Sequence, residues 1–176
     1  MASRKSGHDM MVKRRVFSQD SSISIIWWLV VAALVVVFDQ ISKHWALSLM
    51  QLGETIRVTS FFNLHLLYNE GSAFSFLASQ SGWQRMLFVV IGILAALFIL
   101  YEIRKHRDNS MFCFALALIL GGDIGNVIDR LAFGHVVDFL DFHLGTWHYP
   151  TFNIADCGVC VGALIFVILE FRKKKS

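Results

Sequence analysis

Charged residues and proline are scarce in this chain of 176 residues, and both shortages narrow its class. Asp, Glu, Lys and Arg make up 16% of the residues, compared with about 25% in a typical soluble domain. There is one proline, whereas 56% of the residues are hydrophobic, 16 are phenylalanine and the mean hydropathy is +0.58. The composition argues against an ordinary soluble domain and predicts a single integral membrane domain over residues 1–176.

Cysteine is rare too, and its pattern carries little information. Cys113, Cys157 and Cys160 are odd in number and lie in apolar stretches, so we expect no disulfide framework. The last two have C-x-x-C spacing, but their apolar helical setting favours a packing role over redox chemistry.

Four apolar stretches are long enough to cross a membrane, which takes about 20 helical residues for about 30 Å of hydrocarbon. We predict them at Ile23–Ile41, Gln84–Ile103, Met111–Ile128 and Ile154–Phe171. The first follows a basic segment, as in a secretory signal. It continues without a small-residue cleavage site, so we interpret it as a retained helix.

Lysine and arginine are distributed unevenly along this path. Twelve of the 16 lie before the first span, between the second and third, or after the fourth. The positive-inside rule therefore predicts a cytoplasmic tail over residues 1–20 and a cytoplasmic C-terminus. Residues 42–83 and 130–153 then face outward. A nucleic-acid partner is not expected, because each basic run adjoins a span.

The first outward segment, 42–83, has β-branched and alternating residues at Thr55–Thr59 and Phe61–Tyr68. This pattern predicts two or more short strands with a turn near Gly71, and so a small β-rich insertion on the membrane surface. The second outward segment, 130–153, is expected to be a loop.

Two aspartates in apolar surroundings, Asp138 and Asp156, are the strongest candidates for chemistry. An ionised carboxylate costs about 2.5 to 3.5 kcal/mol at the centre of a membrane helix on insertion scales. Two carboxyl groups that share one proton avoid part of this cost, and they supply both a base and an acid for peptide hydrolysis. The structural alternative is that each aspartate caps a helix or pairs with Arg130.

The end of the third span combines glycines with polar side chains. Asn126 and Asp129 share one helix face, and Asp123 and Arg130 share another about two turns apart. The adjacent Asp129 and Arg130 suggest an ion pair or a hydrogen-bonded support. At the end of the first span, Asp39 and Lys43 have i, i+4 spacing, which is worth only tenths of a kcal/mol on an exposed helix.

Other classes of function are open on residue chemistry alone. A zinc site could combine four outward histidines with two aspartates, but the set lacks a metal-ligand spacing. Its members would be His65, His135, His143, His148, Asp138 and Asp141. A serine–lysine hydrolase is poorly supported, because the neighbours Ser42 and Lys43 point about 100° apart on a helix. A proton-coupled carrier could use a carboxylate relay of Asp123, Asp129, Asp138 and Asp156. A purely structural subunit is the third alternative.

Five motifs in order give the chain a specific likeness: Asp39–Lys43, Asn69–Phe74, Gly122 with Asn126–Arg130, Val136–Phe139 and Phe152–Asp156. Together they resemble the bacterial lipoprotein signal peptidase family (signal peptidase II) over about residues 25 to 171. The resemblance implies an all-α membrane protein of four transmembrane helices, with a small extracytoplasmic β-rich cradle and a periplasmic loop or helix over the site.

The resemblance also implies an aspartic endopeptidase of the bacterial inner membrane. It would cleave diacylglyceryl-modified prolipoproteins before the lipidated cysteine, as a monomer in contact with lipid, without metal or cofactor, and globomycin-like inhibitors would block it. The catalytic aspartates fall on Asp138 and Asp156. Residues that support them or the substrate fall on Asp39, Lys43, Asn69, Gly122, Asn126, Asp129, Arg130 and Asn153.

The chain departs from the family pattern at two places. Asp123 stands where the family usually has a small or apolar residue, and its carboxylate could affect the dyad or contact Arg130. Cys157 and Cys160 stand where Ser or Ala is more usual, which we expect to be harmless.

Overall fold

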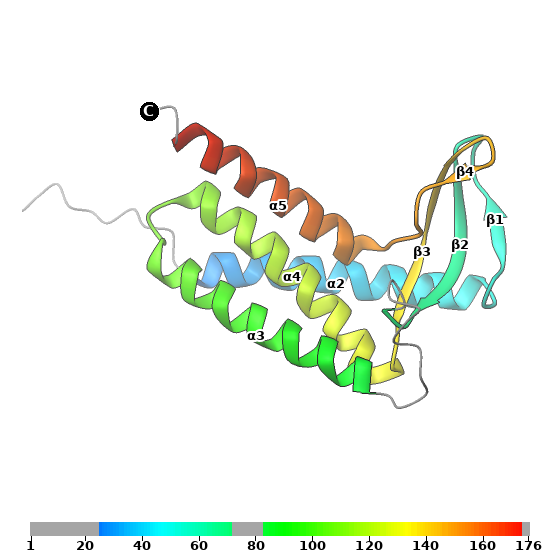
Figure 1. Ribbon diagram of the computed structural model, residues 1–176, viewed down its shortest axis with the longest axis horizontal. Helices are drawn as coiled ribbons and strands as arrows, with labels where there is room; N and C mark the ends of the chain where they lie inside the picture. Colours follow the sequence, from blue (N-terminus) through cyan, green and yellow to red (C-terminus); the bar gives the residue numbers. More distant parts are fainter. Residues whose placement is uncertain (1–24, 72–82, 174–176) are drawn as a thin grey trace, which may run out of the picture.

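The computed structural model describes residues 25–71 and 83–173, and in this part a four-helix bundle carries a small antiparallel sheet at one end (Figure 1). The helices are α2 (Ile25–Leu49), α3 (Trp83–Lys105), α4 (Ser110–Phe133) and α5 (Ile154–Lys173). The strands are β1 (Thr55–Arg57), β2 (Phe62–Asn69), β3 (Val136–Leu144) and β4 (Trp147–His148). The predicted tail at 1–20 and the end of the Asn69–Phe74 motif lie outside the described residues.

All four helices are long and apolar enough to cross a membrane, which confirms the prediction of a multi-pass membrane protein. Their large apolar side chains are mostly exposed along α2, α3 and α5, as expected for surfaces that face lipid. The first helix runs to Leu49, well beyond the predicted end at Ile41. Asp39 and Lys43 therefore lie in the interior of the helix, where both are buried.

Helix α4 is the centre of the bundle, since α2, α3 and α5 all pack against it. Glycines permit the closest of these approaches. A Cβ atom at Gly122 would collide with the carbonyl oxygen of Ala155 in α5, and one at Gly125 would lie 2.6 Å from the Asp39 carboxylate of α2. These glycines therefore bring α2, α4 and α5 into contact at the level of their polar residues.

The end of α4 sets the direction of β3. Gly134 adopts a left-handed conformation with φ of 85° and donates its N–H to the carbonyl of Arg130, which closes the helix. The chain enters β3 two residues later. This strand, which the sequence analysis did not anticipate in the segment 130–153, lies in the sheet order β1-β2-β3-β4 and pairs antiparallel with β2.

An apolar core joins the sheet to the C-terminal end of α2. Its buried members are Ala46, Met50, Leu64, Leu66, Val137 and Phe139. Successive side chains of a strand point to opposite faces of the sheet, so Val137 and Phe139 pack into this core and Asp138 lies on the opposite face. The sheet is thus fixed on the bundle, and one face of β3 is directed toward the polar ends of the helices.

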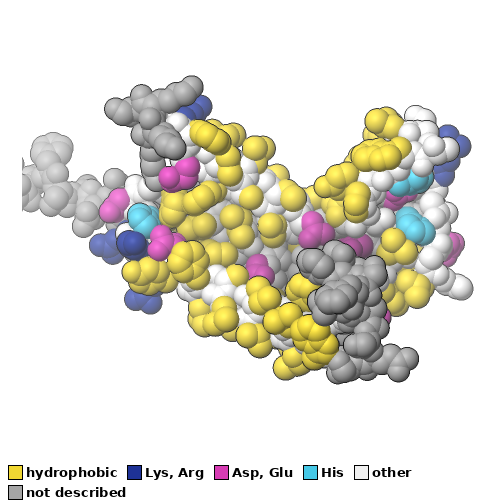
Figure 2. Space-filling model, viewed as in Figure 1, with side chains coloured by type: hydrophobic (Ala, Val, Ile, Leu, Met, Phe, Trp, Pro, Cys, Tyr) yellow, Lys and Arg dark blue, Asp and Glu magenta, His cyan; other side chains and the backbone are white. Residues whose placement is uncertain are grey.

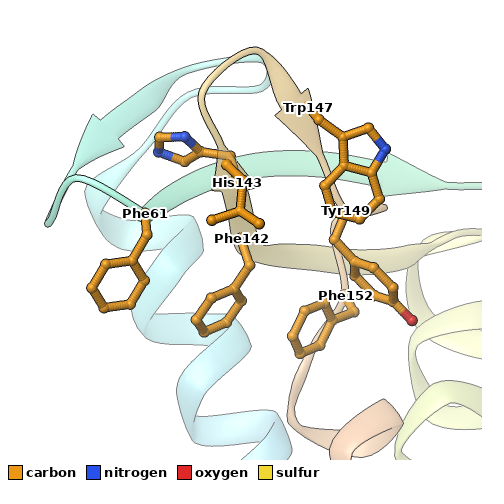
Figure 3. A pocket seen from close by; sticks show the side chains of 7 residues that line it. Phe61, Phe142, His143, Trp147, Tyr149 and Phe152 are labelled. Atoms are coloured by element: carbon orange, nitrogen blue, oxygen red, sulfur yellow. The ribbon is translucent and has the colours of Figure 1, made fainter.

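The tip of the sheet carries an aromatic pocket of about 430 Å³ (Figure 3). Its walls include Phe61, Phe142, Trp147, Tyr149 and Phe152. Its lining among the described residues contains neither Asp138 nor Asp156. Exposed Trp and Tyr side chains are typical of a membrane–water interface.

Candidate active site

The two candidate aspartates come from different elements and meet at one asparagine. Asp138 is the third residue of β3, and Asp156 lies in the first turn of α5. The side-chain amide of Asn153 donates to Asp138 Oδ1 at 2.7 Å, and the backbone N–H of Asn153 donates to Asp156 Oδ2 at 3.1 Å. One fully buried residue therefore holds both carboxylates.

The position of Asn153 follows from its place at the start of α5. Its side-chain oxygen accepts the backbone N–H of Asp156 at 3.0 Å, and the Asp156 carboxylate accepts the N–H of Asn153 in return. This reciprocal pair is a capping box, with aspartate in place of the usual glutamate. Because the amide oxygen of Asn153 is used in the cap, its NH₂ group must point at Asp138.

Asn126 holds Asp156 from the side of α4. Lys43 donates to the Asn126 side-chain oxygen at 3.1 Å, and the Asn126 NH₂ group donates to Asp156 Oδ1 at 2.9 Å. An ammonium group can only donate, so it fixes which end of the amide faces it. Lys43 therefore orients Asn126 toward Asp156 without contacting the catalytic candidates itself.

Asp138 has a partner in the neighbouring strand. Asn69 pairs with Val136 in the β2–β3 ladder, so its side chain lies diagonally across from Asp138 on the same face. Its NH₂ group donates to Asp138 Oδ2 at 3.0 Å. A register shift between Leu64 and Leu67 precedes this contact, and such irregularities re-aim side chains.

The environment of Asp138 favours a protonated carboxyl group. Burial is the main cause and raises its pKa to about 6. The hydrogen bond from Asn69 acts in the opposite direction, the charge of Asp156 raises the pKa further, and Asn153 and Lys43 lower it. Asp138 is 3% exposed, so the burial effect is not relieved by water.

Lys43 lies at the centre of a second polar cluster, formed with Asp39 and Asp129. Its Nζ atom is 2.8 Å from each carboxylate, and all three side chains are buried. Asp39 also accepts the backbone N–H of Ala155, and Asp129 accepts that of Val137. The cluster thus ties α2 and α4 to the start of α5 and to β3, directly beside the two catalytic candidates.

Arg130 has a different role from the one its sequence suggested. Asp129 pairs with Lys43, and the structure shows no ion pair between Asp129 and Arg130. The Arg130 guanidinium lies over the Phe88 ring at 5.0 Å and donates to the backbone oxygen of Asn126. It interacts through space with Asp156 and Asp138, and so adds positive potential without a direct bond to either.

The resemblance assigned ten residues, and the structure brings nearly all of them to one region. Asp39, Lys43, Asn69, Asn126, Asp129 and Asn153 join Asp138 and Asp156 in one hydrogen-bonded network. Gly122 lies outside this network and acts through close packing of α4 on α5. The resemblance assigned no role to Gln40, although it lies within the Asp39–Lys43 motif, and it donates to Asp129 at 2.8 Å. Its place next to Asp39 was the only signal for it.

The sheet holds a further polar group, formed by two residues of the zinc set that the sequence left open, Asp141 and His148, together with Asn63. Asp141 accepts from Asn63 at 2.9 Å and contacts His148 at 2.8 Å. Burial raises the pKa of Asp141, but the hydrogen bonds and the nearby histidines outweigh it, so the net pKa lies below its ordinary value. Within residues 25–71 and 83–173, no group of three or more His, Cys, Asp or Glu side chains is placed to hold a metal ion.

Comparison with known proteins was made for the whole chain. A family model described as signal peptidase (SPase) II matches residues 31–172. A lipoprotein signal peptidase of Janthinobacterium sp. (strain Marseille) is 56% identical over 164 residues, which cover 93% of this chain and 98% of the relative. One of Paraburkholderia phytofirmans is 55% identical over 153 residues, covering 87% and 89%.

Solved structures agree with these sequence matches. A structure described as a bacterial membrane enzyme, at 2.3 Å resolution, has a TM-score of 0.75 and 30% identity. The match covers 85% of this chain and 90% of that one. A second, at 1.9 Å, also has a TM-score of 0.75, with 31% identity.

Proposed function

The chain belongs to the signal peptidase II family, aspartic peptidases that remove signal peptides from prolipoproteins, and we propose that Asp138 and Asp156 perform this reaction here. The observation that carries the proposal is their shared partner. Asn153 bonds to both carboxylates, and neither has a cation as a direct partner among the described residues. Without a counter-charge, two neighbouring carboxyl groups are best stabilised by sharing one proton.

The shared proton gives the pair two roles. The burial that raises the pKa of Asp138 favours Asp138 as the protonated member, which hydrogen-bonds the scissile carbonyl oxygen. Asp156 lies at the N-terminus of α5 and accepts two N–H groups, which complement a negative charge. It takes a proton from the attacking water, whose oxygen bonds to the carbonyl carbon.

The intermediate then breaks down at the C–N bond. The proton taken from water is delivered to the leaving nitrogen, which becomes the new amino terminus, and the signal peptide leaves with a carboxyl group. Arg130 contributes positive potential while charge develops on the carbonyl oxygen. Asn126, Asn153 and Asn69 keep the two carboxylates in place through the cycle.

The substrate of this site is a prolipoprotein whose cysteine carries diacylglycerol, and the cut falls just before that cysteine. The signal segment enters sideways from the lipid, and the diacylglyceryl chains stay in hydrocarbon. Burial of these apolar groups supplies much of the affinity and fixes the position of the scissile bond. Globomycin-like inhibitors occupy the same site, and the enzyme acts as a monomer with its apolar helix surfaces in lipid.

The orientation in the membrane follows from the charges. Arg104, Lys105 and Arg107 lie at the connection between α3 and α4, at the end of the bundle away from the sheet (Figures 1 and 2). The positive-inside rule puts this end in the cytoplasm, together with both termini. The sheet and the two aspartates then face the periplasm, at the outer surface of the inner membrane.

A proton-coupled carrier is not favoured. A carrier requires ionisable groups near the middle of the membrane, whereas most carboxylates here gather at the sheet end of the helices. The comparisons also match peptidases over most of the chain.

The test is cleavage by the purified protein in detergent, with a diacylglyceryl-modified prolipoprotein as substrate. Asp138→Asn and Asp156→Asn should each lower the rate at least about 1,000-fold, because each removes one half of the acid–base pair. Both variants should keep the thermal unfolding profile of the native chain. Cleavage should persist in a chelator. Either variant at full activity would disprove the proposal, and loss of activity in the chelator would favour a metal site.

A further inference from the structure

Asp123 in α4 is a carboxylate that the proposed reaction does not use. Its Oδ1 atom lies against Gly92 of α3, 3.1 Å from where a Cβ atom at that glycine would be. Its Oδ2 atom is buried, and within the described part of the chain it has no hydrogen-bond partner. The side chain is half-buried as a whole, so it is not sealed inside the bundle.

The position of Asp123 on α4 places it below the active site. Seven residues separate it from Arg130, so the two share a helix face about two turns apart. This face lies between α3 and α5, which flank α4 on opposite sides (Figure 1). Figure 2 shows acidic side chains along the same side of the molecule. The only other acidic residue of α4, Asp129, is fully buried.

An unpartnered carboxylate oxygen in a membrane-spanning helix is costly. A buried polar group without a hydrogen bond destabilises its protein, and ionisable residues inside membranes usually serve function. Here the neighbouring groups on α3 are Gly92 and apolar side chains, which cannot donate. Arg130, on the same face of α4, interacts with Asp123 through space, and its guanidinium donates to the backbone oxygen of Asn126 instead. The face between α3 and α5 is where a further donor would enter.

The signal peptide of the substrate is in a position to supply a hydrogen-bond donor to Asp123. It must pass through the membrane below the two aspartates when its end is at the active site. Among the side chains that can donate a hydrogen bond, hydroxyl groups enter hydrocarbon at a lower cost than charged ones. A serine or threonine of the signal peptide is therefore the donor that matches Asp123.

We propose that Asp123 is a specificity residue that accepts a hydrogen bond from a hydroxyl side chain of the signal peptide, close to the scissile bond. The inference rests on the proposed function. Asn126, which bonds Asp156, is one turn above Asp123, or about 4.5 Å along the helix axis. An extended peptide advances about 3.3 Å per residue. The offset is between one and two extended residues, so the hydroxyl belongs one or two residues before the cut.

The experiment compares two diacylglyceryl-modified prolipoproteins that differ only at these two positions, with Ser in one and Ala in the other. Native protein should cleave the Ser substrate with the higher kcat/KM. Asp123→Ala should lower kcat/KM for the Ser substrate by about 3- to 10-fold, the size of a hydrogen bond between membrane helices. It should leave the Ala substrate unchanged. Asp123→Asn, which keeps an acceptor oxygen, should retain most of the preference.

Val127→Ala is the matched control, because Val127 also contacts Gly92 but carries no polar group. It should leave the preference for Ser unchanged. Equal losses on both substrates in Asp123→Ala, or no loss on either, would overturn the inference. Asp156→Asn assayed on the Ala substrate tests the proposed function separately, since that substrate makes no use of Asp123. Cleavage there would reject the dyad, whatever the preference of the Asp123 variants.

Discussion

Two pairs of aspartates lie side by side at the sheet end of the bundle, and they have opposite surroundings. Asp39 and Asp129 flank an ammonium group, with Lys43 Nζ 2.8 Å from each. Asp138 and Asp156 flank Asn153, which donates its side-chain amide to Asp138 and its backbone N–H to Asp156. The same residue type is thus held by a cation in one pair and by neutral donors in the other.

This difference separates structure from chemistry. Each carboxylate of the pair around Lys43 contacts the ammonium group, and each also accepts a backbone N–H, from α5 or from β3. The cation favours the ionised form of these carboxylates. The pair around Asn153 receives hydrogen bonds but no cation, so it keeps a proton that it can transfer. A catalytic pair therefore needs a neighbour that orients it without neutralising it.

The first prediction breaks the structural pair. Lys43→Met leaves Asp39 and Asp129 buried without a counter-charge, and removal of one partner from such a cluster costs about 3 to 5 kcal/mol. We expect a large fall in the midpoint of thermal unfolding in detergent. Asp138→Asn, which replaces the protonated member of the other pair with a neutral amide of similar size, should unfold close to the native midpoint.

A triple variant provides the control for this contrast. Asp39→Asn, Lys43→Met and Asp129→Asn together leave no unpaired charge, so much of the lost stability should return. If Lys43→Met instead unfolded like the native chain but did not cleave, the lysine would belong to the chemistry and the contrast between the pairs would be wrong.

The second prediction separates the two functions of Asn153. Asn153→Ala loses the cap of α5, which is worth about 1 kcal/mol, and also the bond to Asp138. Asn153→Ser restores the cap, because its hydroxyl can accept the N–H of Asp156, but it cannot also donate from an NH₂ group to Asp138. Stability measured by unfolding should recover in the serine variant.

Cleavage should not recover with it. Both variants misplace Asp138, and a small misplacement of a reacting group costs about 100-fold in rate. A serine variant with native activity would show that the cap alone is sufficient, and that the bond between Asn153 and Asp138 has no part in catalysis.

The sequence predicted the bundle well because each span is a long apolar run, and the physical signal is contained within the run itself. It did not predict the full length of α2, because Asp39 and Lys43 interrupt the apolar pattern. Their burial depends on Asp129, which is far along the chain. The ammonium group of Lys43 in α2 contacts the Asp129 carboxylate of α4. The residue spacing within either helix does not indicate this contact between helices.

The site shows the same limit. Asp138 and Asp156 were found because carboxylates in apolar surroundings stand out in any sequence. The strand that carries Asp138 was not found, since Val136–Leu144 has apolar residues without a clear alternation at its start. The capping box of Asn153 and Asp156 was readable from their spacing. Its link to Asp138 was not, because that link exists only once β3 lies against α5.

The last prediction concerns the proton of the catalytic pair, and its effect is the smallest. The Asp138 pKa of about 6 marks the pH above which the pair loses its remaining proton, so kcat/KM should fall as the pH rises beyond it. The hydrogen bond from Asn69 favours the ionised carboxylate and lowers this pKa. Asn69→Ala should therefore move the alkaline limb of the pH profile to higher pH.

Asn69→Asp sharpens the test, because Asn69 also accepts the N–H of Gly71 at 2.9 Å and the aspartate keeps that contact. It replaces a donor to Asp138 with a carboxylate, whose charge disfavours ionisation of Asp138. The limb should move further in the same direction than in the alanine variant. The pair around Lys43 does not contact Asn69, so unfolding midpoints at low pH should stay close to native. A limb that stayed in place in both variants would mean that the proton titrating there is not held by Asp138.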